Sequence, residues 1–266
     1  MLIAKGAVAV PCGRCRACRI ARSRVWASRL LHERTQWPTA TFTTLTYDDE
    51  HIPDWYSLER EHLTNFFKRL RKDISPAKIK YFACGEYGSK YKRPHYHAII
   101  FGLDAYDPVI QENWNLGYVK NGTVTYESAR YVADYIQKSV VGELAYETYD
   151  QTGRERPFCA MSKGLGLDYA KIHIEEWLSH IYNDKPGYTV NGIAMSLPRY
   201  YLRKLLTDEE AEKLKKANKS KIYKLREKLS CEGSDSIDYV FDRRAKQRGL
   251  NADAKSALFS RDNDFI

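Results

Sequence analysis

The stretch Arg93-Pro94-His95-Tyr96-His97-Ala98-Ile99-Ile100-Phe101-Gly102 decides how the rest of the sequence is interpreted. It starts near a proline and continues into apolar residues, a pattern that predicts a buried β-strand. Side chains two positions apart on a strand point to the same face, so His95 and His97 should project together. Two neighbouring imidazoles on a rigid strand can serve as metal ligands, although two half-buried polar residues at a strand start would look the same.

A carboxylate precedes this strand. Residues 78–86 predict a second strand that ends in Glu86, and a short polar turn at 89–92 leads into the histidine strand. The two strands should therefore pair as an antiparallel hairpin, which brings Glu86 near the histidines. Two histidines and one carboxylate form an open metal site that leaves room for substrate oxygen atoms. Alternatively, Glu86 is a solvent-exposed turn residue.

A tyrosine pair follows the histidine strand. The segment Tyr131-Val132-Ala133-Asp134-Tyr135-Ile136-Gln137-Lys138 lies in a helix predicted over residues 129–141, with Ser128 as its cap. Tyr131 and Tyr135 are four residues apart and share one helical face, and Lys138 is close to that face. The same spacing fits an aromatic stripe that packs on a sheet, so the motif alone does not establish a function.

The remaining pattern alternates between helix and strand. Helices are predicted at 19–36, at 58–72 with Ser57 as the cap, at 108–114, at 167–182, and from a capping box at Thr207–Glu210 to about residue 229. Strands are predicted at 2–10 and 39–47, with hairpins turning at Asn121-Gly122 and at Asn191-Gly192. Residues 143–156 read as a loop, and those after Cys231 as a mobile tail.

Three cysteines close to the beginning of the chain form a second candidate metal site. Cys12, Cys15 and Cys18 are spaced so that they could hold structural zinc with a fourth ligand from elsewhere, such as His32, Cys84 or Cys159. An iron–sulfur run would need a further cysteine where the chain has Arg22. The alternative is a set of free thiols in a turn that opens a helix.

Charge and composition narrow the class of protein. The chain has 266 residues and a net charge of +9, concentrated in residues 1–36 and 199–230, whereas residues 37–198 carry a small negative charge. Basic flanks around a near-neutral centre fit phosphate-backbone binding outside a cleft, although ordinary solvated helix faces would also explain them. No run of 18 apolar residues predicts a membrane span, no signal peptide is expected, and six cysteines fit a reducing cytoplasm better than a disulfide scaffold.

The order of the three catalytic motifs resembles that of the HUH endonucleases of rolling-circle replication, in the branch with two tyrosines. The residues that carry the resemblance are Phe42 to Tyr47, Phe82 to Gly88, Arg93 to Gly102 and the Tyr131/Tyr135 helix. Together with the cysteine array they are most similar to the replication initiators of gokushoviruses, phages of the Microviridae. The likeness runs from about residue 11 to residue 206.

The resemblance implies a fold, a reaction and partners. The fold would be α+β, with a central antiparallel sheet of about five strands flanked by helices. His95, His97 and Glu86 would bind Mg²⁺ or Mn²⁺, and Tyr131 or Tyr135 would attack a DNA phosphate with help from the charge of Lys138. Such an enzyme would nick the phage origin in single-stranded DNA in the bacterial host cytoplasm, leave a 5′-phosphotyrosine and a free 3′-OH, and depend on a host polymerase and helicase.

Two other functions stay open at this point. A metal-dependent phosphodiester hydrolase would use the same histidines with water and form no covalent intermediate. A non-catalytic single-strand-binding protein would keep the basic flanks and stacking tyrosines without cutting. In either case the domains would be residues 1–206, with the cysteine-rich basic segment, and residues 207–266, with the basic helix and tail.

Overall fold

The computed structural model describes residues 13, 15–88, 90–138, 145–190, 192–231, 247 and 250–251. Its residues group into two compact units, one of residues 22–169 and one of residues 1–21 and 170–266. The first unit carries the histidine strand and the tyrosine helix. The division expected at residue 206 falls within the second unit and stays a prediction.

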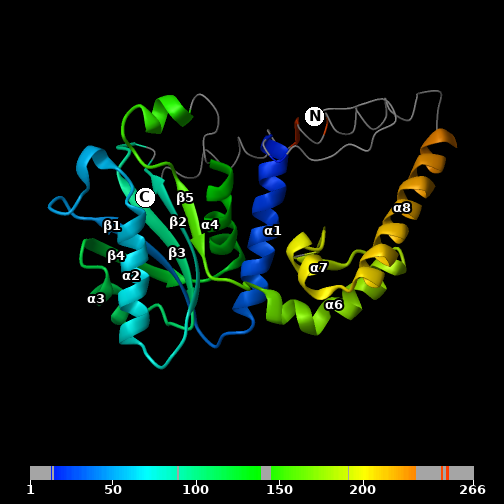
Figure 1. Cartoon of the computed structure of the whole chain (residues 1–266), viewed down its shortest axis with the longest axis horizontal. Helices are drawn as coiled ribbons and strands as arrows, with labels where there is room; N and C mark the ends of the chain where they lie inside the picture. The colour runs from blue at the N-terminus through cyan, green and yellow to red at the C-terminus, as the bar shows by residue number, and fades with distance from the viewer. Residues whose placement is uncertain are drawn as a thin grey trace. The chain divides into compact units, whose positions relative to one another are not determined.

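The elements follow one another along the chain as coloured in Figure 1. The helices are α1 (Arg16–Arg34), α2 (Arg60–Asp73), α3 (Val109–Asn113), α4 (Tyr126–Lys138), α6 (Leu167–Tyr182), α7 (Arg199–Leu205) and α8 (Asp208–Cys231), with single turns η1 (Asp54–Tyr56) and η2 (Tyr146–Asp150). The strands are β1 (Ala40–Tyr47), β2 (Lys80–Tyr87), β3 (Pro94–Phe101), β4 (Gly117–Thr123), β5 (Phe158–Met161), β6 (Tyr188–Val190) and β7 (Ile193–Met195).

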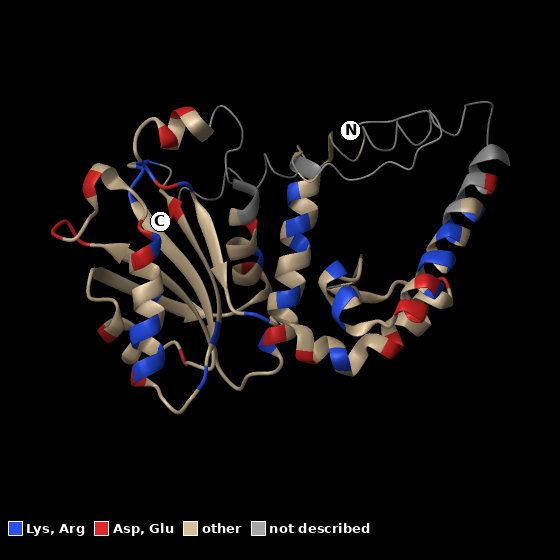
Figure 2. Cartoon of the chain, in the orientation of Figure 1, with Lys and Arg blue, Asp and Glu red and all other residues tan. Residues whose placement is uncertain are grey.

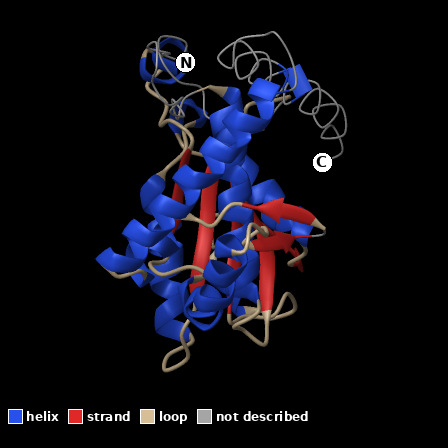
Figure 3. Ribbon diagram, turned by 90° about the vertical axis from the view of Figure 1, so that its right-hand side faces the viewer, coloured by secondary structure: helices blue, strands red, loops and turns tan. Residues whose placement is uncertain are grey.

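Five of these strands form one antiparallel sheet in the order β4-β1-β3-β2-β5. The predicted hairpin of β2 and β3 is present, and the histidine strand β3 lies at the centre of the sheet. Helices flank the sheet, as Figures 1 and 3 show for α2 and α4. The predicted α+β class with a central five-stranded antiparallel sheet is therefore confirmed.

The sheet has a hydrophobic core on each face, which explains why β3 is so apolar. One core joins Leu45, Tyr96 and Ile100 to apolar residues of α2 and α3. The other joins Phe82 and Ile99 to apolar residues of α1 and α4. Alternation along the strand sends Tyr96 to the first core and His95 and His97 to the α4 side. A central strand covered on both faces needs apolar residues on both sides.

A buried carboxylate joins several elements of this unit. Glu33, near the end of α1, accepts hydrogen bonds from the Trp37 indole at 2.7 Å and from the Gly166 amide at 2.6 Å, and pairs with Lys80 of β2 at 2.9 Å. Arg29, one turn earlier, donates to the Leu165 carbonyl at 3.1 Å. These bonds satisfy a charge that would be costly to bury alone, and they fix α1 to the sheet and to the turn before α6.

The region around Asn121-Gly122 differs from the prediction. Instead of turning there, β4 runs straight from Gly117 to Thr123 and pairs with β1 along its whole length. Thr43 on β1 donates to the Asn121 side chain at 3.0 Å, which ties the dipeptide into the ladder. The turn propensity of Asn-Gly is outweighed by a full set of ladder hydrogen bonds to β1.

Two helix starts also differ from the prediction. Thr125 caps α4, because the Ser128 amide donates to its hydroxyl at 3.2 Å and the Ser128 hydroxyl accepts from the Thr125 amide at 2.8 Å. The motif is a capping box three residues earlier than expected. Ser57 caps no helix: its hydroxyl contacts the Leu58 carbonyl, and α2 begins only at Arg60. The strand β5 and the turn η2 were not predicted, and the strand expected at 2–10 lies outside the described residues.

The second unit has a small aromatic core of its own. Trp177 of α6 lies 5.2 Å from the Tyr188 ring in the β6–β7 hairpin and 6.2 Å from the Tyr201 ring of α7. The predicted hairpin and the Thr207–Glu210 capping box are both present, with the Thr207 amide 2.8 Å from the Glu210 carboxylate. Figure 2 shows acidic residues early in α8 and basic residues along its later turns. No helix in the described part of the chain has the length and apolar character of a membrane span.

Candidate metal centre and tyrosine pair

The sheet brings Glu86, His95 and His97 together on the α4 face. Glu86 pairs directly with His95 across β2 and β3, so these side chains point to the same side of the sheet. The Glu86 Oε1 atom lies 2.8 Å from His95 Nε2 and 3.1 Å from His97 Nε2. Among the described residues, this is the one group of at least three His, Cys, Asp or Glu side chains whose donor atoms are close enough to share a metal ion.

Hydrogen bonds behind the histidines fix which ring nitrogen faces Glu86. His95 Nδ1 lies 3.2 Å from the Arg93 carbonyl oxygen, and His97 Nδ1 lies 3.0 Å from the Thr44 hydroxyl. A carbonyl can only accept, so the proton of a neutral His95 ring belongs on Nδ1. Its Nε2 lone pair then faces the carboxylate. Two acceptors at 2.8 Å require a cation between them, which is either a proton or a metal ion.

The donor set fits a divalent metal. Bonds of about 2.1 Å at right angles place neighbouring donor atoms about 3 Å apart, close to the separations found here. Burial alone would raise the pKa of Glu86, but the hydrogen bonds and charge of His95 and His97 lower it to about 2. The carboxylate is therefore ionised at neutral pH, which is the form that binds metal. Imidazole suits transition metals and carboxylate suits Mn²⁺ or Mg²⁺.

Both tyrosines of α4 lie against His97. The Tyr135 ring stacks on the His97 ring at 5.1 Å with 9° between their planes, and the Tyr131 ring meets it edge-on at 5.3 Å. The two tyrosine rings are 4.9 Å apart. α4 is held in place by its packing on β2 and β3 and by the Ser23 hydroxyl of α1, which donates to the Asp134 carboxylate. The predicted common face of the two tyrosines is therefore the face that meets the histidines.

The tyrosines differ in exposure. Tyr135 is only 5% exposed, whereas Tyr131 is half-buried. Burial raises the pKa of both phenols, and the charge of Glu86 raises the pKa of Tyr135 further. Neither hydroxyl would ionise readily by itself at neutral pH. A cation held by the triad, next to His97, would favour the phenolate.

Other predicted site residues are placed as follows. Lys138 is the last residue of α4, and its side chain lies outside the described residues, as does Cys12. Cys15 is exposed just before α1, and Cys18 is partly buried on its first turn. The structural zinc site stays a prediction. Sequence reasoning missed Thr44; the signal that could have found it is its position in the Phe42–Tyr47 strand motif.

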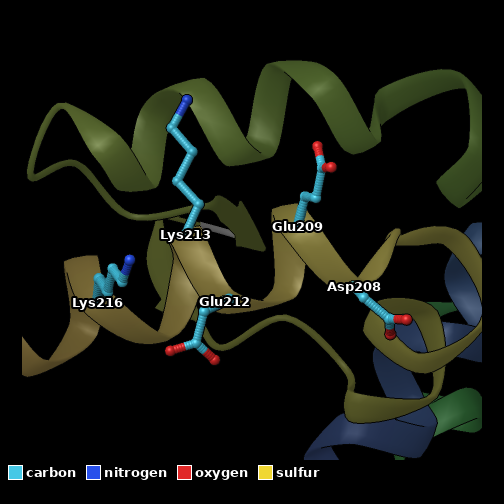
Figure 4. A pocket seen from close by; sticks show the side chains of 5 residues that line it. All are labelled: Asp208, Glu209, Glu212, Lys213 and Lys216. Atoms are coloured by element: carbon cyan, nitrogen blue, oxygen red, sulfur yellow. The ribbon is translucent and has the colours of Figure 1, made fainter.

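A hollow elsewhere in the chain is lined by charged side chains of α8 alone. It measures about 530 Å³ and is bordered by Asp208, Glu209, Glu212, Lys213 and Lys216. Figure 4 shows Lys213 and Glu209 reaching toward the neighbouring helix, and Lys213 lies 4.7 Å from the Tyr182 ring of α6. The hollow contains no donor cluster like that of the triad, and its opposite charges largely offset one another.

Comparisons with known proteins agree with these motifs. Residues 40–140 match the family model of the replication-associated proteins of the ORF2 type. The chain is 33% identical over 224 residues to replication-associated protein VP4 of Bdellovibrio phage phiMH2K, covering 73% of this chain and 66% of that protein. It is 34% identical over 224 residues to replication-associated protein ORF2 of Spiroplasma virus 4, covering 74% and 67%.

A third relative is covered less completely. Replication-associated protein ORF4 of Chlamydia phage 1 is 30% identical over 226 residues, which are 75% of this chain and 55% of that protein. The chain thus spans about two thirds of the first two relatives and just over half of the third. No solved structure matches the chain.

Proposed function

This chain belongs to the family of phage replication-associated proteins of the ORF2 type, and from that membership we propose that it is a metal-dependent endonuclease that starts rolling-circle replication by nicking and rejoining single-stranded DNA. The observation that carries the proposal is the contact of both tyrosine rings of α4 with His97, a member of the Glu86–His95–His97 group. A packing stripe would need only apolar contact. It would not need two hydroxyl-bearing rings beside a cluster of metal-ligating atoms.

The residues of the triad would hold the metal. His95 and His97 offer their Nε2 atoms, because their Nδ1 atoms bond to Arg93 and Thr44, and Glu86 offers a carboxylate oxygen. Mg²⁺ or Mn²⁺ bound there would supply positive charge to the scissile phosphate and to the incoming phenolate. The low pKa of Glu86 keeps its negative charge available for this task.

The tyrosines would act as nucleophiles. The phenol oxygen of Tyr131 or Tyr135 loses its proton and attacks phosphorus, and the bond from phosphorus to the 3′ oxygen of the upstream nucleotide breaks. That 3′ oxygen takes up a proton and becomes the free 3′-OH from which a host polymerase can extend. Because one phosphodiester is exchanged for another, the ends can be rejoined without ATP.

Two tyrosines at one site would allow two successive transfers. With their rings 4.9 Å apart, Tyr131 and Tyr135 lie beside the same histidine. One can hold the first 5′ end while the other attacks the origin junction that replication regenerates. The protein would act inside the bacterial host, and with no phosphate-binding loop motif in its sequence it would rely on a host helicase.

The test is a covalent-adduct assay. Labelled single strands that tile the genome encoding this chain are mixed with the full-length protein and Mn²⁺ or Mg²⁺, then denatured and run on a gel. We expect label on the protein that depends on metal, persists in at least one single variant, Tyr131→Phe or Tyr135→Phe, and disappears in the double variant. Cleavage without labelled protein would replace the proposal by hydrolysis with water, and binding without cleavage of any strand would leave a binding protein.

A further inference from the structure

One face of the edge strand β4 is open beside the candidate metal centre. Tyr118 pairs with Thr46 of β1, which in turn pairs with His95 of β3; Lys120 pairs with Thr44, which pairs with His97. Directly paired residues share a face of the sheet, so both side chains point to the same side as the histidines. Tyr118 is 69% exposed and Lys120 is exposed. We call Tyr118, Lys120, Thr44 and Thr46 the β4 shelf.

α4 leaves this part of the sheet uncovered. It packs on β2 and β3, and its contact with β1 is made through Tyr131, whose ring lies 6.1 Å from the Phe42 ring. Thr44 and Thr46 are half-buried, and the face becomes more exposed toward β4. With strands about 4.8 Å apart, the backbone of Tyr118 lies about 10 Å from that of His95. The shelf is therefore next to the candidate metal centre.

The charge of the shelf suits an anionic strand. The five strands of the sheet, all of which the structure describes, contain three charged residues: Glu86 in the triad, Lys80 and Lys120. Lys80 is paired with Glu33 at 2.9 Å and Asp168 at 3.5 Å. Lys120 forms no ion pair with a residue in the described part of the chain, and β1 and β4 contain no acid. An exposed aromatic ring with one lysine two positions away is the combination that binds single-stranded nucleic acid.

The backbone of β4 is held firmly although its side chains are exposed. On the outer edge, the Gln111 side chain of α3 donates to the Gly117 carbonyl at 3.3 Å and accepts from the Val119 amide at 3.1 Å. On the inner side, a Cβ atom at Gly117 would lie 2.4 Å from the Asp48 nitrogen and from the Thr46 oxygen. The edge on either side of Tyr118 is thus closed to an added strand, and the open surface is the face.

Scattered exposed tyrosines are ordinary, and Tyr106 at 94% exposure is one on the same unit. Tyr118 differs because it stands in the row of His95, beside a lysine in the row of His97, on a strand whose position is fixed from both sides. Resting on the proposed nicking function, we propose that the β4 shelf binds the single-stranded DNA that flanks the scissile phosphate, with a base stacked on Tyr118 and a phosphate beside Lys120.

The test measures binding separately from cleavage. The full chain carrying Tyr131→Phe and Tyr135→Phe is titrated against a labelled oligothymidine by fluorescence anisotropy, at several salt concentrations, with Tyr118 and Lys120 variants added. We expect Tyr118→Leu to weaken binding about tenfold and Tyr118→Trp to restore it. Lys120→Gln should lower the slope of log K against log salt by about 0.7, the value for one phosphate contact. Tyr106→Leu and Lys72→Gln, at exposed positions away from the shelf, are the matched controls.

The outcomes separate this proposal from the proposed reaction. Binding by Tyr118→Leu equal to that of Tyr106→Leu, or a salt slope unchanged by Lys120→Gln, overturns the shelf even if the wild-type chain forms the covalent adduct. Weaker binding in both shelf variants, with no adduct from the wild-type chain, supports the shelf as a strand-binding surface and removes the nicking reaction. Circular dichroism of each variant checks that the exposed substitutions leave the fold intact.

Discussion

Replacing Thr44 by valine should weaken metal binding without disturbing the fold. The Thr44 hydroxyl lies 3.0 Å from His97 Nδ1 and is the group that fixes the orientation of that ring from behind. Valine has nearly the same shape but no acceptor, so His97 would lose its preference for presenting Nε2 to the triad. Partners of this kind behind a metal ligand are generally worth about 10- to 100-fold in affinity.

The structure places the expected effect at the low end of that range. A single hydrogen bond contributes about 0.5–1.5 kcal/mol. The His97 ring is also stacked against Phe42 at 5.7 Å and Tyr135 at 5.1 Å, with planes within 11° and 9°, so it cannot turn far when the hydroxyl is gone. We therefore expect about tenfold weaker binding, which corresponds to about 1.4 kcal/mol.

Isothermal titration with Mn²⁺ at constant pH measures this effect, and Thr46→Val is the matched control. Thr46 is on the same face of β1, but its hydroxyl donates to the Tyr118 carbonyl at 3.3 Å rather than to a histidine. Both variants should unfold in urea within about 1 kcal/mol of the wild type when metal-free. Wild-type affinity in Thr44→Val, or an equal loss in both variants, would refute the role assigned to the Thr44 hydroxyl.

Four further outcomes follow from the site and from β4. Mn²⁺ should raise the melting temperature of the wild type but not of Glu86→Gln, because only a chain that binds metal gains stability from it; a shift in both would place the metal elsewhere. Tyr131→Phe should slow the first adduct more than Tyr135→Phe, because Tyr135 is only 5% exposed; the reverse order in a time course would contradict this. Since burial raises the pKa of both phenols above 10.0, less phenolate is present at neutral pH, and the nicking rate should rise from about pH 8 to about pH 9.5; a plateau from the lower of these values would mean that another group takes the proton. Gly117→Ala should destabilise the chain by more than about 2 kcal/mol in urea unfolding, since its φ is 148° and its Cβ would meet backbone at 2.4 Å, whereas Gly122→Ala meets nothing within 4 Å and should cost less than about 1 kcal/mol.

The sequence was sufficient for the centre of the fold because its signals there are local and consistent. Alternation put His95 and His97 on one face, and the short connection to Glu86 left an antiparallel hairpin as the natural arrangement. Helical spacing placed Tyr131 and Tyr135 together. The side of the sheet that they cover depends on tertiary packing, which single-residue patterns do not contain.

The errors lie where distant contacts decide the structure. Asn121-Gly122 has the composition of a turn, but pairing with β1 holds it in a strand. β5 is only four residues long and follows a polar segment, so it shows little periodicity, and it is recognised by its pairing with β2. Thr44 contributes through one hydroxyl that bonds to a residue 53 positions away. No local pattern announces such a bond.

The bonds of Glu33 have a practical consequence for anyone who shortens the chain. Similarity to the family begins at residue 40 and ends at residue 140, yet the unit that folds extends from residue 22 to residue 169. A fragment cut at the limits of similarity would lack α1 and β5. It would leave Lys80 without its buried carboxylate, and Phe82 and Ile99 would lose part of their covering. The segment that inheritance marks is smaller than the segment that thermodynamics requires, so an expression fragment should be bounded by Glu33 and its partners.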